Sequence, residues 1–299
     1  MPSPSPAAAA EVAAAPAGPP ARRLILPIAV ALVIVLVAVI ALWRAAASHR
    51  PAPVSLASLH WMFYREDLGR IALMAPGLIG RTLAGPGTYV LERSAGGTLP
   101  PGAIPTQVFF SATDLRTAIR DGTVIPGVRA VLDDPEYWPA TSPAEQRDPV
   151  PAMRRFAQAA RSGGYQPILA PGRDLTEAPG AGCAKTQAQT LTLSYLNCGI
   201  PAAARRASVF VIQSAPVETR LGQLVLLVSR AAAQARAANP HVIVLATLST
   251  TVGTRPVGPA MLATAARAML PYVRGFLVNT TPATDGRLIS CLRLLASGS

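Results

Sequence analysis

The stretch Arg129–Met153, RAVLDDPEYWPATSPAEQRDPVPAM, contains the pattern from which the fold can be inferred. It begins with a short apolar run, Arg129 to Leu132, that is typical of a buried strand and stops at the acids Asp133, Asp134 and Glu136. A proline-rich loop and a helical pattern follow. Strand, loop and helix in this order form the repeating unit of α/β proteins, which bind ligands at the carboxyl ends of their strands. The sequence therefore places a candidate site directly after this strand.

Similar apolar runs recur along the chain, with helical patterns between them. Most are continuously apolar rather than alternating, as expected of parallel strands that are buried on both faces. Alternation of strand and helix indicates a parallel sheet with right-handed crossovers. An eighth strand is not clearly marked, and either 61–64 or 71–74 is apolar enough to supply it. The seven predicted strands are Thr88–Leu91, Gln107–Phe110, Val128–Leu132, Gln166–Ala170, Ser208–Ile212, Val242–Leu248 and Gly275–Val278.

Chain length helps to choose between the two common parallel architectures. The part of the chain after position 50 has about the 250 residues that a (β/α)8 barrel needs. No glycine-rich phosphate loop follows any predicted strand, which removes the usual support for an open, doubly wound nucleotide-binding sheet. We therefore predict an α/β fold, a (β/α)8 TIM-type barrel that is complete or lacks one strand. It should occupy residues 61–299, after a linker at 44–60.

Two local patterns mark where helices begin. Ser142-Pro143-Ala144-Glu145 has the spacing of a capping box, with proline at the first helical position. Thr113-Asp114 is expected to cap a helix over Leu115–Arg120. Both predicted helices follow strands, as the barrel requires.

The first 50 residues have a different composition. Residues 1–23 are rich in proline and alanine and are predicted to be a disordered cytoplasmic tail. Leu24–Trp43 is uncharged throughout. About 20 such residues span roughly 30 Å as a helix, which matches the hydrocarbon core of a bilayer. We interpret 24–43 as an uncleaved transmembrane signal anchor. The alternative is a signal peptide cleaved near Ala45-Ala46-Ala47.

Charge argues against a nucleic-acid partner. The formal net charge is +12, from 27 Lys and Arg against 15 Asp and Glu. The arginines are scattered along the chain, and aromatic residues make up only 5%. A nucleic-acid-binding protein would gather its basic residues on one face and interleave them with aromatics. A solvated basic surface is the simpler interpretation.

The cysteines suggest on which side of the membrane the barrel lies. Cys183 and Cys198 bracket a polar loop, and a disulfide closing a loop of this length would stabilise the fold by about 3 kcal/mol. A metal site is the alternative, but no histidine or further cysteine stands at ligand spacing. Cys291 is expected to be a buried free thiol. Because disulfides form in oxidising compartments, we predict a single-pass protein of the cell membrane with an extracellular barrel.

Three segments together resemble a known group of proteins: LDDPEYWPATSPAEQRDP (132–149), ARAANPHVIVLATLSTT (235–251) and GFLVNTT (275–281). They are similar to the membrane-anchored, glycoside-hydrolase-like barrel proteins of high-GC Gram-positive bacteria. The resemblance extends over roughly residues 88 to 282. It implies a barrel fold and an extracellular site, and it brings no established catalytic residues to carry over.

The chemistry of the strand ends suggests which residues form the site. Paired carboxylates hydrolyse glycosidic bonds, and aromatic side chains stack on sugar rings. Asp134-Pro135-Glu136 resembles the strand-end acid pair of substrate-assisted, chitinase-like barrels. Many retaining glycosidase barrels carry their carboxylates on the fourth and seventh strands; by the seven-strand count these end at Asp174 and at Asn279-Thr280-Thr281, so the second carboxylate is missing. The candidate catalytic residues are Asp133, Asp134, Glu136 and Glu92, and the candidate substrate-binding residues are Tyr137, Trp138, Gln213 and Asn279.

Each of these residues also has a structural interpretation. Asp133 and Asp134 can cap a turn or pair with an arginine, and Tyr137 and Trp138 can pack on the barrel rim. No cofactor is expected, and a metal site or catalytic triad is disfavoured because the three histidines do not cluster. Three classes of function stay open: a hydrolase of wall or extracellular glycan, a glycan-binding barrel without catalysis, and a structural module of the cell envelope. Whether the protein is an enzyme is thus left open.

Overall fold

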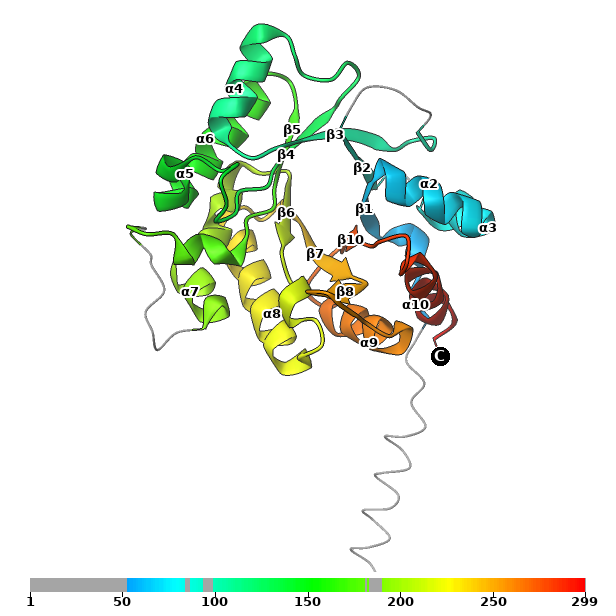
Figure 1. Ribbon diagram of the computed structural model, residues 1–299. Coiled ribbons are helices and arrows are strands. Elements are labelled where there is room, and N and C mark those ends of the chain that lie inside the picture. The colour runs from blue at the N-terminus through cyan, green and yellow to red at the C-terminus, as the bar shows by residue number, and fades with distance from the viewer. Residues whose placement is uncertain (1–52, 84–86, 94–98, 181, 183–189, 299) are drawn as a thin grey trace, which may run out of the picture. The chain divides into compact units, whose positions relative to one another are not determined.

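Eight parallel strands close into a barrel in the computed structural model, which describes residues 53–83, 87–93, 99–180, 182 and 190–298. Figure 1 shows the helices arranged around the outside of this ring of strands. The predicted TIM barrel is confirmed, and it is complete. The barrel strands are β1 (His60–Tyr64), β2 (Thr88–Glu92), β3 (Ile104–Phe109), β4 (Ala130–Asp133), β5 (Gln166–Leu169), β6 (Val209–Ile212), β7 (Ile243–Ser249) and β10 (Gly275–Asn279).

Helical segments follow every barrel strand except β2, after which the described residues contain none, and they cover the barrel. Around the ring the hydrogen-bonded order is β1-β10-β7-β6-β5-β4-β3-β2, so strands that follow one another in the chain are neighbours. A small antiparallel hairpin, β8 (Thr251–Val252) with β9 (Arg255–Pro256), follows β7. The α-helices are α2 (Arg65–Met74), α3 (Pro76–Leu78), α4 (Ala112–Asp121), α5 (Pro143–Arg147), α6 (Pro149–Ser162), α7 (Leu191–Asn197), α8 (Leu221–Ala238), α9 (Pro259–Met269) and α10 (Asp285–Ser297).

Shorter helical segments lie between these elements. They are the 3-10 turns η1 (Leu56–Ser58), η3 (Arg173–Glu177), η4 (Ile200–Arg206) and η5 (Ala215–Val217), and the π-helical turn η2 (Ile79–Leu83).

The strand that the sequence left open is β1. Trp61 and Phe63 pack in the layer under the helices, whereas Met62 packs inside the barrel, so this segment is apolar on both faces. The alternative segment, 71–74, belongs to α2. Every later strand therefore moves up by one in the count. The strand before Asp134 is the fourth, and the expectation that the fourth strand ends at Asp174 is wrong.

Closure of the ring depends on Gly275 at the start of β10. Its φ is 157°, and an added Cβ would lie 1.8 Å from the carbonyl oxygen of His60, its partner in β1. No side chain fits at that separation. Glycine therefore allows the eighth strand to approach the first and complete the barrel.

The hydrophobic core has two layers, one inside the barrel and one between the strands and the helices. Side chains alternate between the layers because successive residues of a strand point to opposite faces. On β4, Ala130 and Leu132 fill the interior while Val131 packs under the helices. This alternation decides which residues at each strand end reach the barrel mouth.

Helix starts agree with the sequence in one case and differ in the other. Ser142 caps α5 by accepting a hydrogen bond from the backbone N–H of Glu145, and Pro143 is the first helical residue, as predicted. In α4 the cap is Ser111, whose side chain accepts from the backbone N–H of Asp114. The prediction that Thr113-Asp114 caps this helix is wrong, because both residues already lie inside its first turn.

Several predictions fall on residues outside the described ranges. They concern the tail, the membrane span at 24–43, most of the linker and Cys183, and they stay predictions. Within the described ranges, no helix has the length and apolarity to cross a membrane. Cys291 is a buried free cysteine on α10, as expected.

Candidate functional site

Three carboxylates from two neighbouring loops gather at the carboxyl end of the barrel. Asp134 follows β4 directly, Glu136 lies two residues further on, and Asp174 lies in the loop after β5. The Nε2 amide of Gln213, after β6, donates to Asp134 Oδ1 at 2.8 Å and to the carbonyl oxygen of Ala170 at 2.7 Å. It also donates to Glu136. We call Asp134, Glu136 and Asp174 with Gln213 the acid cluster.

The acid cluster binds protons more tightly than free carboxylates do. Burial and, to a smaller extent, the negative charges of Glu136 and Asp174 raise the pKa of Asp134 to about 7, although the hydrogen bond from Gln213 opposes them. Burial also raises the pKa of Glu136, and Asp174 adds to this. The pKa of Asp174 is also raised, mainly by burial. Hydrogen bonds from backbone N–H groups, chiefly that of Tyr137, oppose part of this increase. A protonated and an ionised carboxyl group can therefore lie side by side near neutral pH.

Gly172 lets the two loops meet. Its backbone N–H donates to the carbonyl oxygen of Pro135 at 2.8 Å, which joins the loop after β5 to the loop after β4. A Cβ at this position would lie 2.3 Å from Asp174 Oδ1 and 2.9 Å from Glu136 Cγ. The close approach of Asp174 to Glu136 thus requires a glycine.

Beside the acid cluster, aromatic side chains line a pocket of about 450 Å³. Phe110, after β3, and Trp138, in the loop after β4, meet edge to face with their ring centroids 4.8 Å apart. Trp138 is still 38% exposed, so part of its ring is available to a ligand. The lining residues are Tyr64, Glu92, Arg93, Gln107, Val108, Phe110 and Trp138.

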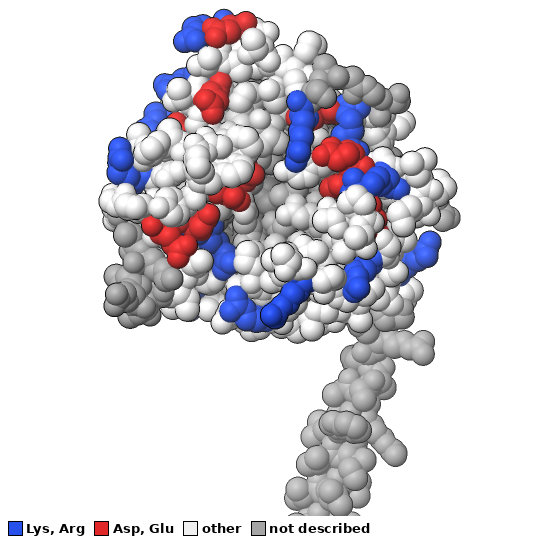
Figure 2. Space-filling model, in the orientation of Figure 1, with Lys and Arg blue, Asp and Glu red and all other residues white. Residues whose placement is uncertain are grey.

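Tyr64, at the end of β1, links this pocket to the acid cluster. The Arg93 guanidinium lies over the Tyr64 ring, 4.9 Å from its centroid. Burial raises the pKa of the Tyr64 hydroxyl, and the charge of Asp134 raises it further, which places Asp134 near the phenol. Aromatic faces, a guanidinium and carboxylates therefore border the same part of the mouth. Figure 2 shows that acidic and basic side chains both border the hollow at the centre of its view.

Asp133 is not part of this group. It shares the face of Val131, so it points under the helices, where it is only 2% exposed and its Oδ1 has no hydrogen-bond partner among the described residues. Burial raises its pKa well above the usual range, and the nearby charge of Glu145 adds to this. Glu145 accepts backbone hydrogen bonds from Ala112 and Thr113 at the start of α4. Strand alternation thus separates the two consecutive aspartates.

Glu92 borders the aromatic pocket, but its carboxylate is committed to an arginine. Arg65 donates to both of its oxygens, from Nε to Oε2 at 2.5 Å and from Nη2 to Oε1. Glu92 is only 3% exposed. The sequence had left open that Asp133 or Asp134 pairs with an arginine. In the structure it is Glu92 that forms such a buried ion pair.

The other predicted residues lie apart from the acid cluster. Asn279 is exposed at the end of β10, which is opposite β4 in the ring. Tyr137 is exposed, and its contribution to the cluster is the backbone N–H that Asp174 accepts. Of the candidate residues, the structure brings together Asp134, Glu136 and Gln213, with Trp138 beside them.

The seventh strand offers no carboxylate to the mouth. It ends at Ser249, and Ser249 is followed by threonine. The backbone N–H of Ser249 donates to the Glu218 carboxylate at 3.0 and 3.2 Å, but Glu218 is completely buried. Burial raises the pKa of Glu218 to about 8. This acid stabilises the end of β7 from the side and does not face a ligand.

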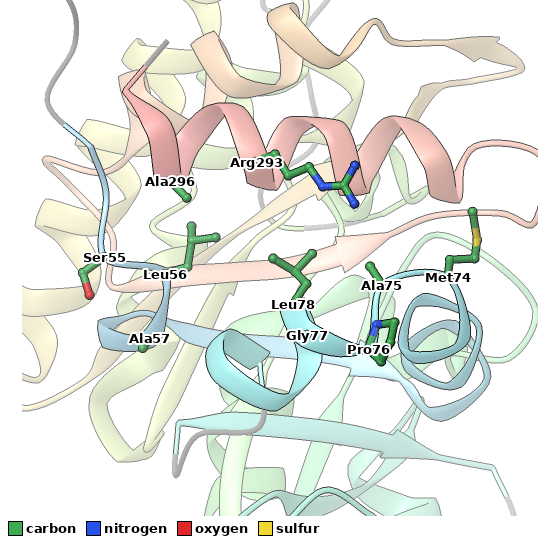
Figure 3. Close-up of a pocket in the computed structure, with 10 residues that line it drawn as sticks. All are labelled: Ser55, Leu56, Ala57, Met74, Ala75, Pro76, Gly77, Leu78, Arg293 and Ala296. Carbon is green, nitrogen blue, oxygen red and sulfur yellow. The ribbon is translucent and has the colours of Figure 1, made fainter.

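A second pocket, of about 580 Å³, lies at the amino end of the barrel. Figure 3 shows Leu56 and Leu78 pointing toward α10, from which Arg293 and Ala296 complete the lining. The residues before β1 and the last turns of α2 and α10 form this pocket, whereas TIM-barrel sites occupy the opposite end. Among the described side chains, no group of three or more His, Cys, Asp or Glu could hold a metal ion. The acid cluster is therefore the candidate site.

Sequence reasoning missed Asp174, Tyr64 and Phe110. Asp174 had been noticed at the end of the strand counted as the fourth, but it was not chosen because the strand counted as the seventh supplied no second carboxylate. Tyr64 and Phe110 each directly follow or end an apolar run, so the alternation of strand residues would have placed both side chains at the mouth.

Comparison with known proteins supports the fold and gives no information on the function. No family model matches the chain, and no curated protein matches it. A solved structure described as a "putative alpha-L-fucosidase" from Bacteroides thetaiotaomicron is similar with a TM-score of 0.50 and 7% identity, over 83% of this chain and 96% of that one.

Two other solved structures are similar with lower scores. Phosphonopyruvate hydrolase in complex with oxalate and Mg²⁺ matches with a TM-score of 0.43 and 12% identity, over 80% of this chain and 81% of that one. The carboxyl transferase domain of Rhizobium etli pyruvate carboxylase with 3-bromopyruvate matches at 0.41 and 11%, over 81% of this chain. The chain spans about half, 48%, of the length of that last structure.

Proposed function

We propose that the barrel is a carbohydrate-active hydrolase that cleaves glycosidic bonds with carboxylates of the acid cluster. The observation that carries this proposal is Asp134, a carboxyl group whose pKa is raised to about 7 beside two further acids and an aromatic pocket. A carboxyl group that keeps its proton near neutral pH can act as a general acid. The distant structural similarity to the protein described as a fucosidase is consistent with this and supports only the fold.

Each member of the acid cluster has a role in the proposed reaction. Asp134 gives its proton to the oxygen of the leaving sugar as the glycosidic bond breaks. Gln213 holds that carboxyl group by its 2.8 Å hydrogen bond. Glu136, in its ionised form, either attacks the anomeric carbon or removes a proton from the attacking water. Asp174 keeps a negative charge nearby and so maintains the raised pKa of Asp134.

The pocket beside the acid cluster supplies the surface on which a sugar would rest. Trp138 and Phe110 present aromatic faces and edges, and apolar faces of sugar rings stack on such groups. Gln107 and Arg93 add hydrogen-bond donors at the same pocket. Aromatic walls with a few convergent polar groups are typical of small-ligand sites.

The proposed location is the outer face of the cell membrane, with glycans of the wall or the extracellular space as substrates. This part of the proposal rests on the uncharged segment 24–43 and on the cysteine pair, as set out from the sequence. Carbonate extraction tests it: the full-length chain should stay with membranes, and recovery of a soluble form that begins near Ser48 would contradict it.

A second candidate is a barrel that binds glycan without cleaving it. The observation that favours it is the end of β7, where Ser249 and Thr250 replace the carboxylate that many retaining glycosidase barrels carry there. In that case the aromatic pocket would still bind sugar, and the acid cluster would accept hydrogen bonds from sugar hydroxyls.

A turnover screen on the full-length chain separates the two candidates. We expect hydrolysis of at least one member of a panel of aryl glycosides and polysaccharides. Asp134→Asn and Glu136→Gln should each lower the rate by roughly 10²–10⁴-fold, the usual contribution of a positioned acid or base. Asp148→Asn, which removes an exposed carboxylate outside the acid cluster, is the matched control. Binding that depends on Trp138 without turnover would favour the second candidate, and neither binding nor turnover would contradict both.

The product of any turnover also reports on the mechanism. If Glu136 attacks the anomeric carbon, the first product retains the configuration of the substrate, whereas deprotonation of water inverts it. Proton NMR of the freshly released sugar distinguishes the two.

A further inference from the structure

A buried arginine next to the acid cluster has no acidic partner among the residues that the structure describes. Arg173 begins the turn η3, directly before Asp174, and only 8% of its surface is exposed. Nη1 donates to Thr192 Oγ1 at 3.0 Å. No carboxylate of the described residues lies within ion-pair distance of its guanidinium. Because buried charges are almost always paired, this arrangement calls for a negative partner from elsewhere.

A second arginine, Arg220, lies close enough to act on Arg173. Burial lowers the pKa of the Arg173 guanidinium and the positive charge of Arg220 lowers it further, whereas Tyr195 and Asp174 raise it by less. Arg220 precedes α8 in the loop after β6, and it is exposed. Its Nη2 donates to the carbonyl oxygen of Pro216 at 3.1 Å and not to an acid. Two guanidinium groups on neighbouring loops are thus close enough to influence each other.

The free nitrogen atoms of Arg173 are in a position to bind a ligand. Nε and Nη2 have no hydrogen-bond partner among the described residues, yet neither belongs to the polar atoms that are sealed from solvent. The hydroxyl of Tyr195, close enough to influence Arg173, is itself buried and without a partner in the described part of the chain. Two nitrogens of a guanidinium can bind two oxygens of one anionic group.

The location of these groups connects them to the proposed reaction. Arg173 and Asp174 are consecutive, so the guanidinium and the acid cluster lie on the same loop. Gln213 joins the ends of β5 and β6 through its bond to the Ala170 carbonyl, and Arg173 and Arg220 follow these two strands. An anion held here would be bordered by the loops that carry the acid cluster.

We propose that Arg173 and Arg220 form a subsite for an anionic group of the substrate, a carboxylate or sulfate carried by a sugar. The subsite deepens the proposed carbohydrate function and rests on it. It would select acidic glycans over neutral ones, because a neutral sugar leaves the Arg173 guanidinium without a counter-charge. It would also position the sugar that carries the charge next to the acid cluster.

Binding of small anions to the full-length chain tests the subsite. The probes are glucuronate and galacturonate, their neutral counterparts glucose and galactose, and inorganic sulfate, each followed by calorimetry at constant ionic strength. We expect each uronate to bind the wild-type chain at least tenfold more tightly than its neutral counterpart. Arg173→Gln should abolish this preference, and Arg220→Gln should weaken uronate binding severalfold.

Two variants serve as controls for the loss of charge and for misfolding. Arg205→Gln removes an equal charge from the turn before β6, at the opposite end of the barrel, and should leave uronate binding unchanged. Arg220→Gln changes an exposed residue and so keeps the test decisive should Arg173→Gln fail to fold. Sulfate that binds through Arg173 as tightly as uronate would assign the subsite to a bare oxyanion rather than to a sugar.

The outcomes distinguish this proposal from the proposed function. The subsite would be overturned by any of three results. Uronates and neutral sugars could bind with equal affinity, neither uronates nor sulfate could bind, or Arg173→Gln and Arg205→Gln could lose the same amount of uronate affinity. Hydrolysis of a neutral glycan that still depends on Asp134 would leave the proposed function intact in that case. Loss of Asp134-dependent turnover on every substrate, with Arg173-dependent uronate binding, would instead retain the subsite in a binding protein.

Discussion

Replacing Asp134 with asparagine should make the protein more stable at alkaline pH. The pKa of this carboxyl group rises from 3.8 to about 7 in the folded chain. Each pKa unit corresponds to about 1.4 kcal/mol, so ionising Asp134 costs about 4 kcal/mol more in the folded protein than in the unfolded chain. Asparagine has a similar shape and cannot ionise. The variant avoids that cost, while it loses the proton donor that the proposed reaction needs.

The sign of the effect fixes its pH dependence. The folded chain binds the proton of Asp134 more tightly than the unfolded chain, so the stability contributed by that proton is fully present below about pH 4 and is lost as pH rises through about 7. The difference in unfolding free energy between Asp134→Asn and wild type should therefore grow over this range. Above pH 8 we expect the variant to be more stable by about 4 kcal/mol, a figure that already includes the hydrogen bond from Gln213 to the carboxylate.

Urea denaturation of the full-length chain from pH 4 to 8.5 measures this difference. Tryptophan fluorescence reports unfolding, because Trp61 is completely buried in the core. Asp148→Asn is the control for the loss of one exposed carboxylate. A difference that does not change with pH, or a wild type that is the more stable at pH 8, would refute the raised pKa of Asp134 and with it the general-acid role.

Three further predictions test other parts of the structure. Arg65→Gln should cost about 2–4 kcal/mol in urea denaturation, because it leaves the buried Glu92 carboxylate unpaired, and adding Glu92→Gln should recover part of the loss. Gly172→Ala should lower turnover or glycan affinity at least tenfold with a stability change of about 1 kcal/mol, since its methyl group displaces Asp174 and Glu136; unchanged function would contradict the role of that close approach. Non-reducing peptide mapping should find Cys183 joined to Cys198, and free thiols at both would argue against an extracellular barrel.

The fold could be predicted from sequence because its strands carry their own signal. Most of the seven runs, such as Ser208–Ile212, are continuously apolar and alternate with helical patterns, which indicates a parallel sheet. Chain length and the missing glycine-rich loop then favoured a barrel over an open sheet. β1 was ambiguous because it and the 71–74 segment of α2 are both short and apolar, and periodicity cannot separate a short buried strand from a short buried helix. That one ambiguity shifted the strand count and moved the fourth-strand comparison to the wrong loop.

The site was harder to predict than the fold, for physical reasons. Asp133 and Asp134 are consecutive residues of the same type, and the sequence does not distinguish their roles. Alternation along β4 places Asp133 under the helices and Asp134 at the mouth. Glu92 looked as suitable as Asp134 until the structure placed Arg65 against it. The approach of Asp174 depends on Gly172 and on the contact between two loops, and no local pattern encodes a contact between loops. Gln213 was predicted, from its place at a strand end, to hydrogen-bond sugar hydroxyls; in the structure its side chain donates to Asp134.

The distribution of ion pairs bears on whether the mouth is functional. Two buried acids are paired with arginine, Glu92 with Arg65 and Asp285 with Arg70 at 2.7 Å, whereas among the described residues the buried acids Asp133 and Glu218 are not. In the described part of the chain, Asp134, Glu136 and Asp174 have no such ion pair, although arginines lie close by on the same loops. Desolvated acids left unpaired cost stability, and folds keep costs of this kind mainly where a ligand or a reaction uses them. Arg173 shows the complementary imbalance one residue from Asp174. Within the described ranges, the acid cluster and the Arg173 guanidinium thus lie unpaired on adjoining loops. A substrate with both hydroxyl and anionic groups would supply hydrogen bonds to the acids and a counter-charge to the arginine.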